Sequence, residues 1–511
     1  MNNNNYTQSY NEMGNRPPVV QGQAVSASIY AHDAKFPEVT KGEHQPTKFN
    51  DMLWSVLFTA HLIAIGCLSA IYIPQVANIE GNRMLMEGSP QKASISQFFS
   101  SKLGSQSRFL EDQDGESFDY DVSSILTLVL ISAIFGFVLS IASLSIMMKY
   151  AEGLIKAGLF FQLAAAFLTG LSGFLLGASE ILITGLIFFA FTACFACAVW
   201  SRIPFAATNL ATATTAVRAN SGLTFFAYVS IVVTIGWLIW WSTTATATIM
   251  IVADCDAEGN CNNEVNGFVV FLLLVSLYWT LQVVKNVVHV TVAGTVGTWW
   301  WSPLEANSCC SGAVRTSYTR AITYSFGSIC LGSLIVAIVQ AVKKILQQMR
   351  DSDDGILLCI AECCLGILES LLELFNSFAF VYVGLYGYGF IDAAKAVVNL
   401  FKERGWSAII TDSLAHYVLT MVSICVGLIV GAISALISYS AQLNVEGAAF
   451  FIGLIIGTTL TQILMGVVGS AVDTVIVCYA EDPNAFQANH PELSERMRDT
   501  WRQAYPENFR Y

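Results

Sequence analysis

Charged residues are scarce in this chain of 511 residues, of which 12% are charged and 54% hydrophobic. A soluble domain carries about 25% charged residues, so this composition excludes an ordinary soluble protein. Nine stretches run for roughly 20 residues or more without Asp, Glu, Lys or Arg, the length that a helix needs to cross a hydrocarbon core of about 30 Å. The sequence therefore predicts a protein that crosses a membrane many times.

The apolar runs also lack the alternation of apolar and polar residues that marks the strands of a membrane barrel. In lipid the backbone then satisfies its own polar groups as α-helices, so we expect an all-α transmembrane bundle. The loops contain no phosphate-binding P-loop, nucleophile motif or metal-ligand spacing, which predicts no enzyme activity, no cofactor and no metal site. The net charge of −12 offers no basic face for nucleic acid.

Ten apolar segments are expected to cross the membrane within a transmembrane domain of residues 52–480. A polar tail, residues 1–51, precedes this domain and is expected to be disordered; it lacks the pattern of a cleaved signal peptide. Residues 481–511 are expected to form a second tail. The expected spans lie near residues 53–73, 122–148, 157–177, 181–200, 222–252, 266–300, 321–342, 376–391, 413–438 and 447–478.

Lys and Arg set the expected orientation, because they accumulate in short loops on the cytoplasmic side. Basic residues follow the second, fourth and sixth spans, whereas the alternate loops carry acidic residues. Both termini are therefore expected in the cytoplasm, and residues 75–121 as an exoplasmic loop. Six acidic residues lie between Glu111 and Asp121 in this loop; they either raise the local concentration of cations or simply solvate the loop.

One region breaks the alternation, because basic residues flank the eighth span on both sides. This short span, 376–391, contains three glycines and is predicted either to cross the membrane or to re-enter it. Before it, residues 355–375 place Glu362, Glu369 and Glu373 at helical spacing against apolar residues. This pattern predicts an amphipathic helix lying in the membrane interface.

Four polar residues of the sixth span, which we call the polar row, are Gln282, Lys285, Asn286 and His289. Their positions i, i+3, i+4 and i+7 stack the side chains on one helix face. That face must contact protein or water, because polar groups exposed to lipid cost several kcal/mol. The row therefore predicts either a solute site or a seam of hydrogen bonds between helices.

Lys285 is expected to have a carboxylate nearby, because an isolated buried ammonium would lose its proton or draw in water. The expected partners are Asp473 in the tenth span and Asp392, which ends the eighth span together with Lys395. Either carboxylate would keep the ammonium charged inside the bundle.

Aromatic residues form a second group in the fifth and sixth spans. Trp240, Trp241, Tyr278 and Trp279 offer ring faces to a quaternary ammonium, a contact worth roughly 0.5 to 2 kcal/mol. They join Gln282, Asn286 and His289 as predicted substrate-binding residues. The run 299–301, three tryptophans at the end of the sixth span, is expected to belong to the aromatic belt of the membrane interface.

Cys255 and Cys261 flank an acidic loop after the fifth span. A disulfide between them requires an oxidising environment, which the exoplasmic side provides. Two free loop thiols are the alternative. The sequence therefore allows one disulfide, between Cys255 and Cys261, and does not distinguish it from two free thiols.

Short segments spread along the chain are typical of one family of membrane proteins. They are 48–51 (KFND), 286–294 (NVVHVTVAG), 297–300 (GTWW), 324–334 (YSFGSICLGSL), 385–387 (LYG), 390–395 (FIDAAK) and 473–483 (DTVIVCYAEDP). On these segments the chain resembles the choline transporter-like family, most closely its branch of fungal pH-nine-sensitive proteins, over nearly all of residues 48–490. The resemblance implies ten helices, cytoplasmic termini, and transport of choline or a related organic cation across the plasma membrane.

The sequence thus predicts a carrier or facilitator for a small organic cation, surrounded by membrane lipid and without covalent chemistry. The alternative is a membrane scaffold or lipid-handling protein that moves no small solute, in which the polar row is structural. The oligomeric state is not set by the sequence.

Overall fold

Every regular element is a helix in the part of the chain that the computed structural model describes, which confirms the all-α prediction. That part comprises residues 47–87, 122–253, 266–309, 311–352, 356–404, 407–441 and 446–504. The helices are α1 (Met52–Glu87), α3 (Val122–Leu175), α4 (Ser179–Val199), the 3₁₀ turn η3 (Trp200–Arg202), α5 (Ile203–Ala219), α6 (Gly222–Val252), α7 (Gly267–Trp301), α8 (Gly312–Ile322), α9 (Phe326–Ser352), α10 (Ile356–Tyr386), α11 (Phe390–Arg404), α12 (Ser407–Ser440), α13 (Glu446–Glu481), α14 (Pro483–Asn489) and α15 (Pro491–Ala504).

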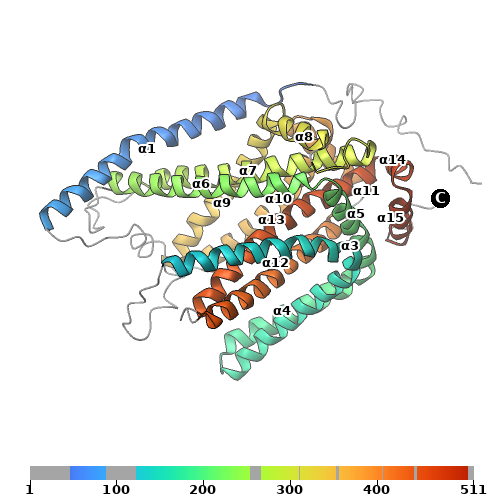
Figure 1. The fold of residues 1–511 in the computed structure, drawn as a ribbon, viewed down its shortest axis with the longest axis horizontal. Coiled ribbons are helices and arrows are strands. Elements are labelled where there is room, and N and C mark those ends of the chain that lie inside the picture. Colours follow the sequence, from blue (N-terminus) through green and yellow to red (C-terminus); the bar gives the residue numbers. More distant parts are fainter. Residues whose placement is uncertain are drawn as a thin grey trace, which may run out of the picture.

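The long helices run roughly side by side, and the short helices α8, α14 and α15 lie toward one end of the bundle (Figure 1). We call this the α14 end. The C-terminus of α7 lies there, because α14 packs against it. We call the other end, where α9 finishes and α10 begins, the α9–α10 end.

Nine helices in the described residues are long and apolar enough to cross a membrane. One of them, α3, has 54 residues and breaks at Tyr150, whose φ of −125° and ψ of 26° are not helical. The helix changes direction at this break (Figure 1), and its two halves cover the second and third expected spans. The ten expected spans therefore correspond to nine helices, one of them bent.

Glycines allow α12 and α13 to pack closely, together with the first half of α3. A methyl group added at Gly457 of α13 would lie 2.8 Å from Cβ of Val430 and 3.1 Å from Cα of Gly427, both in α12. One added at Gly136 of α3 would lie 3.3 Å from Cα of Gly457. Small residues spaced four apart, as Gly453 and Gly457 are, bring membrane helices into backbone contact. We call α3, α12 and α13 the glycine-packed unit.

Residues 355–375 and 376–391 were expected to form separate elements, but α10 runs without interruption from Ile356 to Tyr386. The expected break between Phe375 and Asn376 is therefore wrong. The polar face of residues 355–375 is covered by α7 and α9, whose side chains form hydrogen bonds with its carboxylates. The carboxylates therefore do not require the helix to lie in the membrane interface. The chain turns only at Gly387, which has a φ of 66°.

Residues beyond 481 were expected to form a tail, yet 483–504 fold into α14 and α15 and pack against the bundle. Phe486 is fully buried, and Trp501 packs with ring centroids 4.7 Å from Phe205 and 4.2 Å from Tyr479. The sequence pattern does not indicate this docking, because the outer faces of both helices are polar. Both helices belong to the main hydrophobic core.

The end of the first expected tail is also fixed, although residues 1–46 lie outside the described part. The Asn50 amide Nδ2 donates to the Gly387 carbonyl at 2.6 Å. The Asp51 carboxylate accepts hydrogen bonds from Ser328 Oγ and from the Phe390 backbone N–H, each at 2.7 Å. These bonds join the start of α1 to the start of α9 and to the turn between α10 and α11.

Candidate functional site

The polar row of α7 is turned toward α9, α10 and α13. Gln282, Asn286 and His289 are each 8% exposed, whereas the Lys285 side chain is 64% exposed. The row thus has a buried part and an accessible part. This arrangement follows from its spacing, which places all four residues on one face of the helix.

Direct hydrogen bonds close the buried part of the row. Asn286 Nδ2 donates to Ser333 Oγ of α9 at 2.9 Å. His289 Nε2 donates to the Ser377 carbonyl of α10 at 2.9 Å, and its Nδ1 lies 2.8 Å from Ser470 Oγ of α13. The row therefore links three neighbouring helices.

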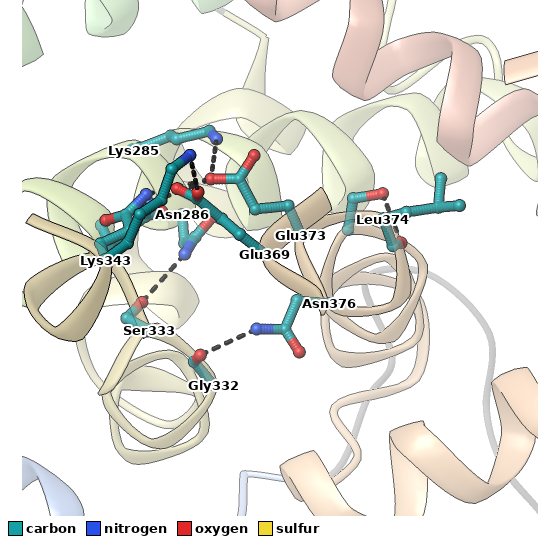
Figure 2. Close-up of polar contacts among 12 residues, drawn as sticks. Lys285, Asn286, Gly332, Ser333, Lys343, Glu369, Glu373, Leu374 and Asn376 are labelled. Carbon is teal, nitrogen blue, oxygen red and sulfur yellow. Dashed lines mark hydrogen bonds and ion pairs between the residues drawn. The ribbon is translucent and has the colours of Figure 1, made fainter. Parts of the chain in front are cut away.

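The accessible part of the row meets Glu373 of α10, and Figure 2 shows Lys285 and Glu373 pointing toward one another. The carboxylate accepts hydrogen bonds from the amides of Gln282 and Gln340, each at 3.3 Å. Lys285 Nζ lies 4.0 Å away, which is the outer limit for an ion pair. Glu373 is therefore oriented by two amides and only loosely neutralised.

Further polar pairs continue from Glu373 toward the α9–α10 end. Lys343 Nζ lies 2.7 Å from Glu369 Oε2 (Figure 2), and Gln347 donates to Glu362 at 2.9 Å. Glu369 has a tight cationic partner, which Glu373 lacks. Of these two carboxylates, Glu373 has the longer contact with a cation and the more exposed side chain, 38% against 18% for Glu369.

The carboxylate next to Lys285 is Glu373, and neither Asp392 nor Asp473 occupies that place. Asp392 lies near the surface of α11, 3.1 Å from Lys395. Asp473 is buried in α13, 3.4 Å from His416 of α12. The two expected partners lie on other helices with partners of their own.

The four predicted aromatic residues do not converge on the polar row. Trp279 is buried, donates from Nε1 to the Cys330 carbonyl and stacks on His61 at 5.0 Å. Trp241 packs in a separate apolar cluster between α1, α6 and α7, and Trp240 is 38% exposed. Tyr278 alone lies within electrostatic range of Glu369 and Lys343.

The three tryptophans at the end of α7 were expected in the interfacial belt, but α14 covers them. Trp299 and Trp300 are 3% and 0% exposed, and Trp300 stacks on Phe486 at 3.9 Å. Asn489 Nδ2 donates to the carbonyls of Trp300 and Trp301, and His490 Nε2 donates to that of Trp299. These side chains therefore cap the carbonyls that the end of a helix leaves without partners.

Two predicted features lie outside the described residues: the pair Cys255 and Cys261, and the acidic stretch from Glu111 to Asp121. A hollow of ≈ 170 Å³ lies between α3 and α4, away from the polar row. Phe167, Phe174 and Phe189 line it, so it offers no polar group to a solute.

Sequence reasoning missed Gln340, Lys343 and the site role of Glu373. The available signal was that Glu369, Glu373 and Asn376 recur at helical spacing across the expected boundary between residues 355–375 and the eighth span. That periodicity identifies a polar face, but it does not distinguish a face covered by water from one covered by another polar helix.

Comparison with known proteins identifies the family of this chain. The sequence pattern of the family described as plasma-membrane choline transporter matches residues 183–484. Protein pns1 of Aspergillus fumigatus is 31% identical over 58% of this chain and 59% of its own length. Protein PNS1 of Kluyveromyces lactis is 26% identical over 96% and 87%, and a CTL-like protein of Dictyostelium discoideum is 28% identical over 77% and 69%. The match therefore covers about three fifths of the Aspergillus relative.

Proposed function

This chain belongs to the plasma-membrane choline transporter family, and on that premise we propose that it moves choline or a related organic cation by a carrier or facilitator mechanism. The membrane crossed is the plasma membrane, with both termini in the cytoplasm. The α9–α10 end then faces outward and the α14 end inward. Gln282, Asn286, His289 and the carboxylate of Glu373 form the central site.

The observation that carries this proposal is the state of Glu373. A trimethylammonium group donates no conventional hydrogen bonds, so a protein recognises its charge with carboxylates and aromatic ring faces. Glu373 belongs to a helix long and apolar enough to cross the membrane; its side chain is 38% exposed, is held by two amides and is only loosely neutralised. A carboxylate in such surroundings is costly, and attracting a cation is a function that offsets this cost.

In the same mechanism, the Lys285 ammonium occupies the place beside Glu373 when no substrate cation is bound. Its ammonium lies 4.0 Å from Glu373, and 64% of its side chain is exposed. Because the lysine side chain is long and flexible, it can move aside when a solute cation approaches. The Phe380 ring lies 6.3 Å from that of His289, and Tyr278 lies within electrostatic range of Glu369 and Lys343.

Uptake of labelled choline in cells without endogenous carriers tests the proposal. Glu373→Gln keeps the side-chain shape and removes the charge, so we expect uptake efficiency to fall about tenfold or more. The control is Glu152→Gln, which removes a carboxylate from a surface ion pair with Lys156. Equal uptake by wild type and Glu373→Gln, at equal surface expression, would reject Glu373 as the central carboxylate.

The same assay separates a carrier from a scaffold or lipid-handling protein. A carrier gives saturable uptake that other quaternary amines inhibit. A wild-type chain that reaches the cell surface and gives no uptake above background would favour the second function.

A further inference from the structure

Three tyrosines gather at the α14 end of α10, between about 2.5 and 4 helical turns from Glu373 along the chain. The rings of Tyr382 and Tyr388 are nearly parallel, with an interplanar angle of 4° and centroids 6.4 Å apart. Tyr386 stacks against both, at 5.7 Å from Tyr382 and 5.4 Å from Tyr388. Three ring faces are thus held within one small region.

The backbone turn after α10 produces this arrangement. Gly387 has a φ of 66°, a conformation that other residues rarely adopt, and it directs Tyr388 back toward α10. The Asn50 side chain holds the turn through its bond to the Gly387 carbonyl. The three rings are therefore fixed by the fold.

Glu481, the last residue of α13, supplies negative charge to the same place. Its Oε1 accepts a hydrogen bond from the Tyr382 hydroxyl at 2.6 Å, and its charge acts on all three tyrosines. The residue is exposed, and no Lys or Arg among the described residues forms an ion pair with it. Burial, reinforced by Glu481, raises the pKa of Tyr388 above 10.0, so its hydroxyl stays protonated.

Tyr386 provides an independent observation at the same place. Its side chain is 6% exposed, and its hydroxyl has no hydrogen-bond partner. A buried hydroxyl without a partner costs roughly 1 to 3 kcal/mol, so native structures usually satisfy it. Glu481 acts on this hydroxyl electrostatically without bonding to it.

From these observations we propose that Tyr382, Tyr386, Tyr388 and Glu481 form a second binding site, for a small quaternary ammonium that carries an alcohol group. The Glu481 carboxylate and the partly exposed Tyr388 ring, backed by Tyr382 and Tyr386, recognise the positive charge, and the Tyr386 hydroxyl pairs with the alcohol. Choline has this chemistry; its choice as ligand rests on the proposed function, whereas the site itself rests on the tyrosines and Glu481. The site serves as a station at the α14 end, separate from Glu373.

Two probes separate the roles of charge and alcohol. Tetramethylammonium carries only the charge, and choline carries both groups. Glu481→Gln is expected to weaken binding of both probes about tenfold at this site, and Tyr388→Leu about fivefold. Tyr386→Phe is expected to weaken choline about fivefold and to leave tetramethylammonium unchanged, because only choline pairs with the hydroxyl.

Equilibrium binding of both labelled probes to the purified full chain in nanodiscs measures these effects. Each variant is made in wild type and in Glu373→Gln, so that the second site is read without the central one. The controls are Glu495→Gln, an exposed carboxylate of α15, and Tyr417→Phe, whose hydroxyl bonds to the Gly158 carbonyl elsewhere. Thermal melting of each variant checks that it is folded.

The outcomes distinguish this site from the central one. Binding that persists in Glu373→Gln and is lost in the double variant with Glu481→Gln supports the second site. Loss of all binding in Glu373→Gln alone overturns the second site and leaves the central one standing. Unchanged binding in every Glu481 and tyrosine variant, or no binding of either probe to wild type, also overturns it. Binding that depends on Glu481 and not on Glu373 supports the second site and counts against the central carboxylate.

Discussion

The interface among α3, α12 and α13 differs from the part of the α7, α9 and α10 interface that surrounds Glu373, although α7 and α10 also pack closely elsewhere, at Gly384 against Val290 and Ala293. In the glycine-packed unit, Gly427 and Gly457 bring backbones into contact, and an added methyl group at either position meets its neighbours at 3.1 Å or less. Between α7, α9 and α10, long polar side chains such as Gln282 and Glu373 bridge the helices. A backbone contact has one geometry, whereas long side chains can exchange partners. We therefore expect the first interface to stay fixed and the polar contacts around Glu373 to rearrange.

The largest effect should come from disrupting the fixed interface. Gly457→Leu places its Cβ 2.8 Å from Val430, against a helix backbone that has no space to shift. We expect the substitution to destabilise the fold by at least about 3 kcal/mol, so little monodisperse protein should survive solubilisation. Size-exclusion chromatography and thermal melting measure this.

Gly466→Leu, on the same helix, is the matched control. A Cβ at Gly466 meets nothing within 4 Å, so this variant should behave as wild type. If both leucine variants are equally stable, α12 and α13 are not held by close packing and the contrast between the interfaces is lost.

A smaller effect is expected at the hydrogen bond between Asn286 and Ser333. A double-mutant cycle with Asn286→Ala and Ser333→Ala should give a coupling of about 1 kcal/mol, the net value of one buried bond. Both single variants should remain folded and alter choline uptake more than thermal stability. Coupling near zero in both assays would mean that the polar interface contributes neither stability nor transport at this point.

The smallest effect concerns pH at the α14 end. Burial lowers the pKa of His490 below its ordinary 6.5, although the bond to the Trp299 carbonyl partly opposes this. The undocked state therefore takes up a proton more readily, so docking is strongest above pH 6.5 and weakens as pH falls below it. Amides of α14 should exchange hydrogen a few times faster, relative to intrinsic rates, at pH 5.5 than at pH 7.5.

His490→Phe keeps a ring against Trp299 and cannot be protonated. Its corrected exchange rates should differ little between the two pH values. If wild type and this variant respond equally to pH, another group controls the docking of α14.

Hydropathy and charge were sufficient to predict the helical bundle, because a run of about 20 apolar residues has few alternatives in lipid. Hydropathy and charge were insufficient to predict which helix faces contact one another. Glu373 and Trp300 both received an interfacial interpretation, since polar faces and tryptophans also occur where membrane meets water. Glu373 instead meets Gln282 of α7, and Trp300 lies beneath Phe486. A contact between distant segments, such as that of Asn50 with Gly387, produces no periodic sequence pattern in either segment, so it cannot be predicted from periodicity.

The single uninterrupted length of α7 has a mechanical consequence. With 35 residues it forms a rod of about 52 Å, whose two ends cannot tilt independently. Gln282 and Lys285 connect α7 to Glu373 near the middle of the helix, and Asn489 and His490 cap its C-terminal end. We therefore expect a displacement of α7 at Glu373 to be felt at the caps formed by Asn489 and His490, because one continuous helix connects the two points.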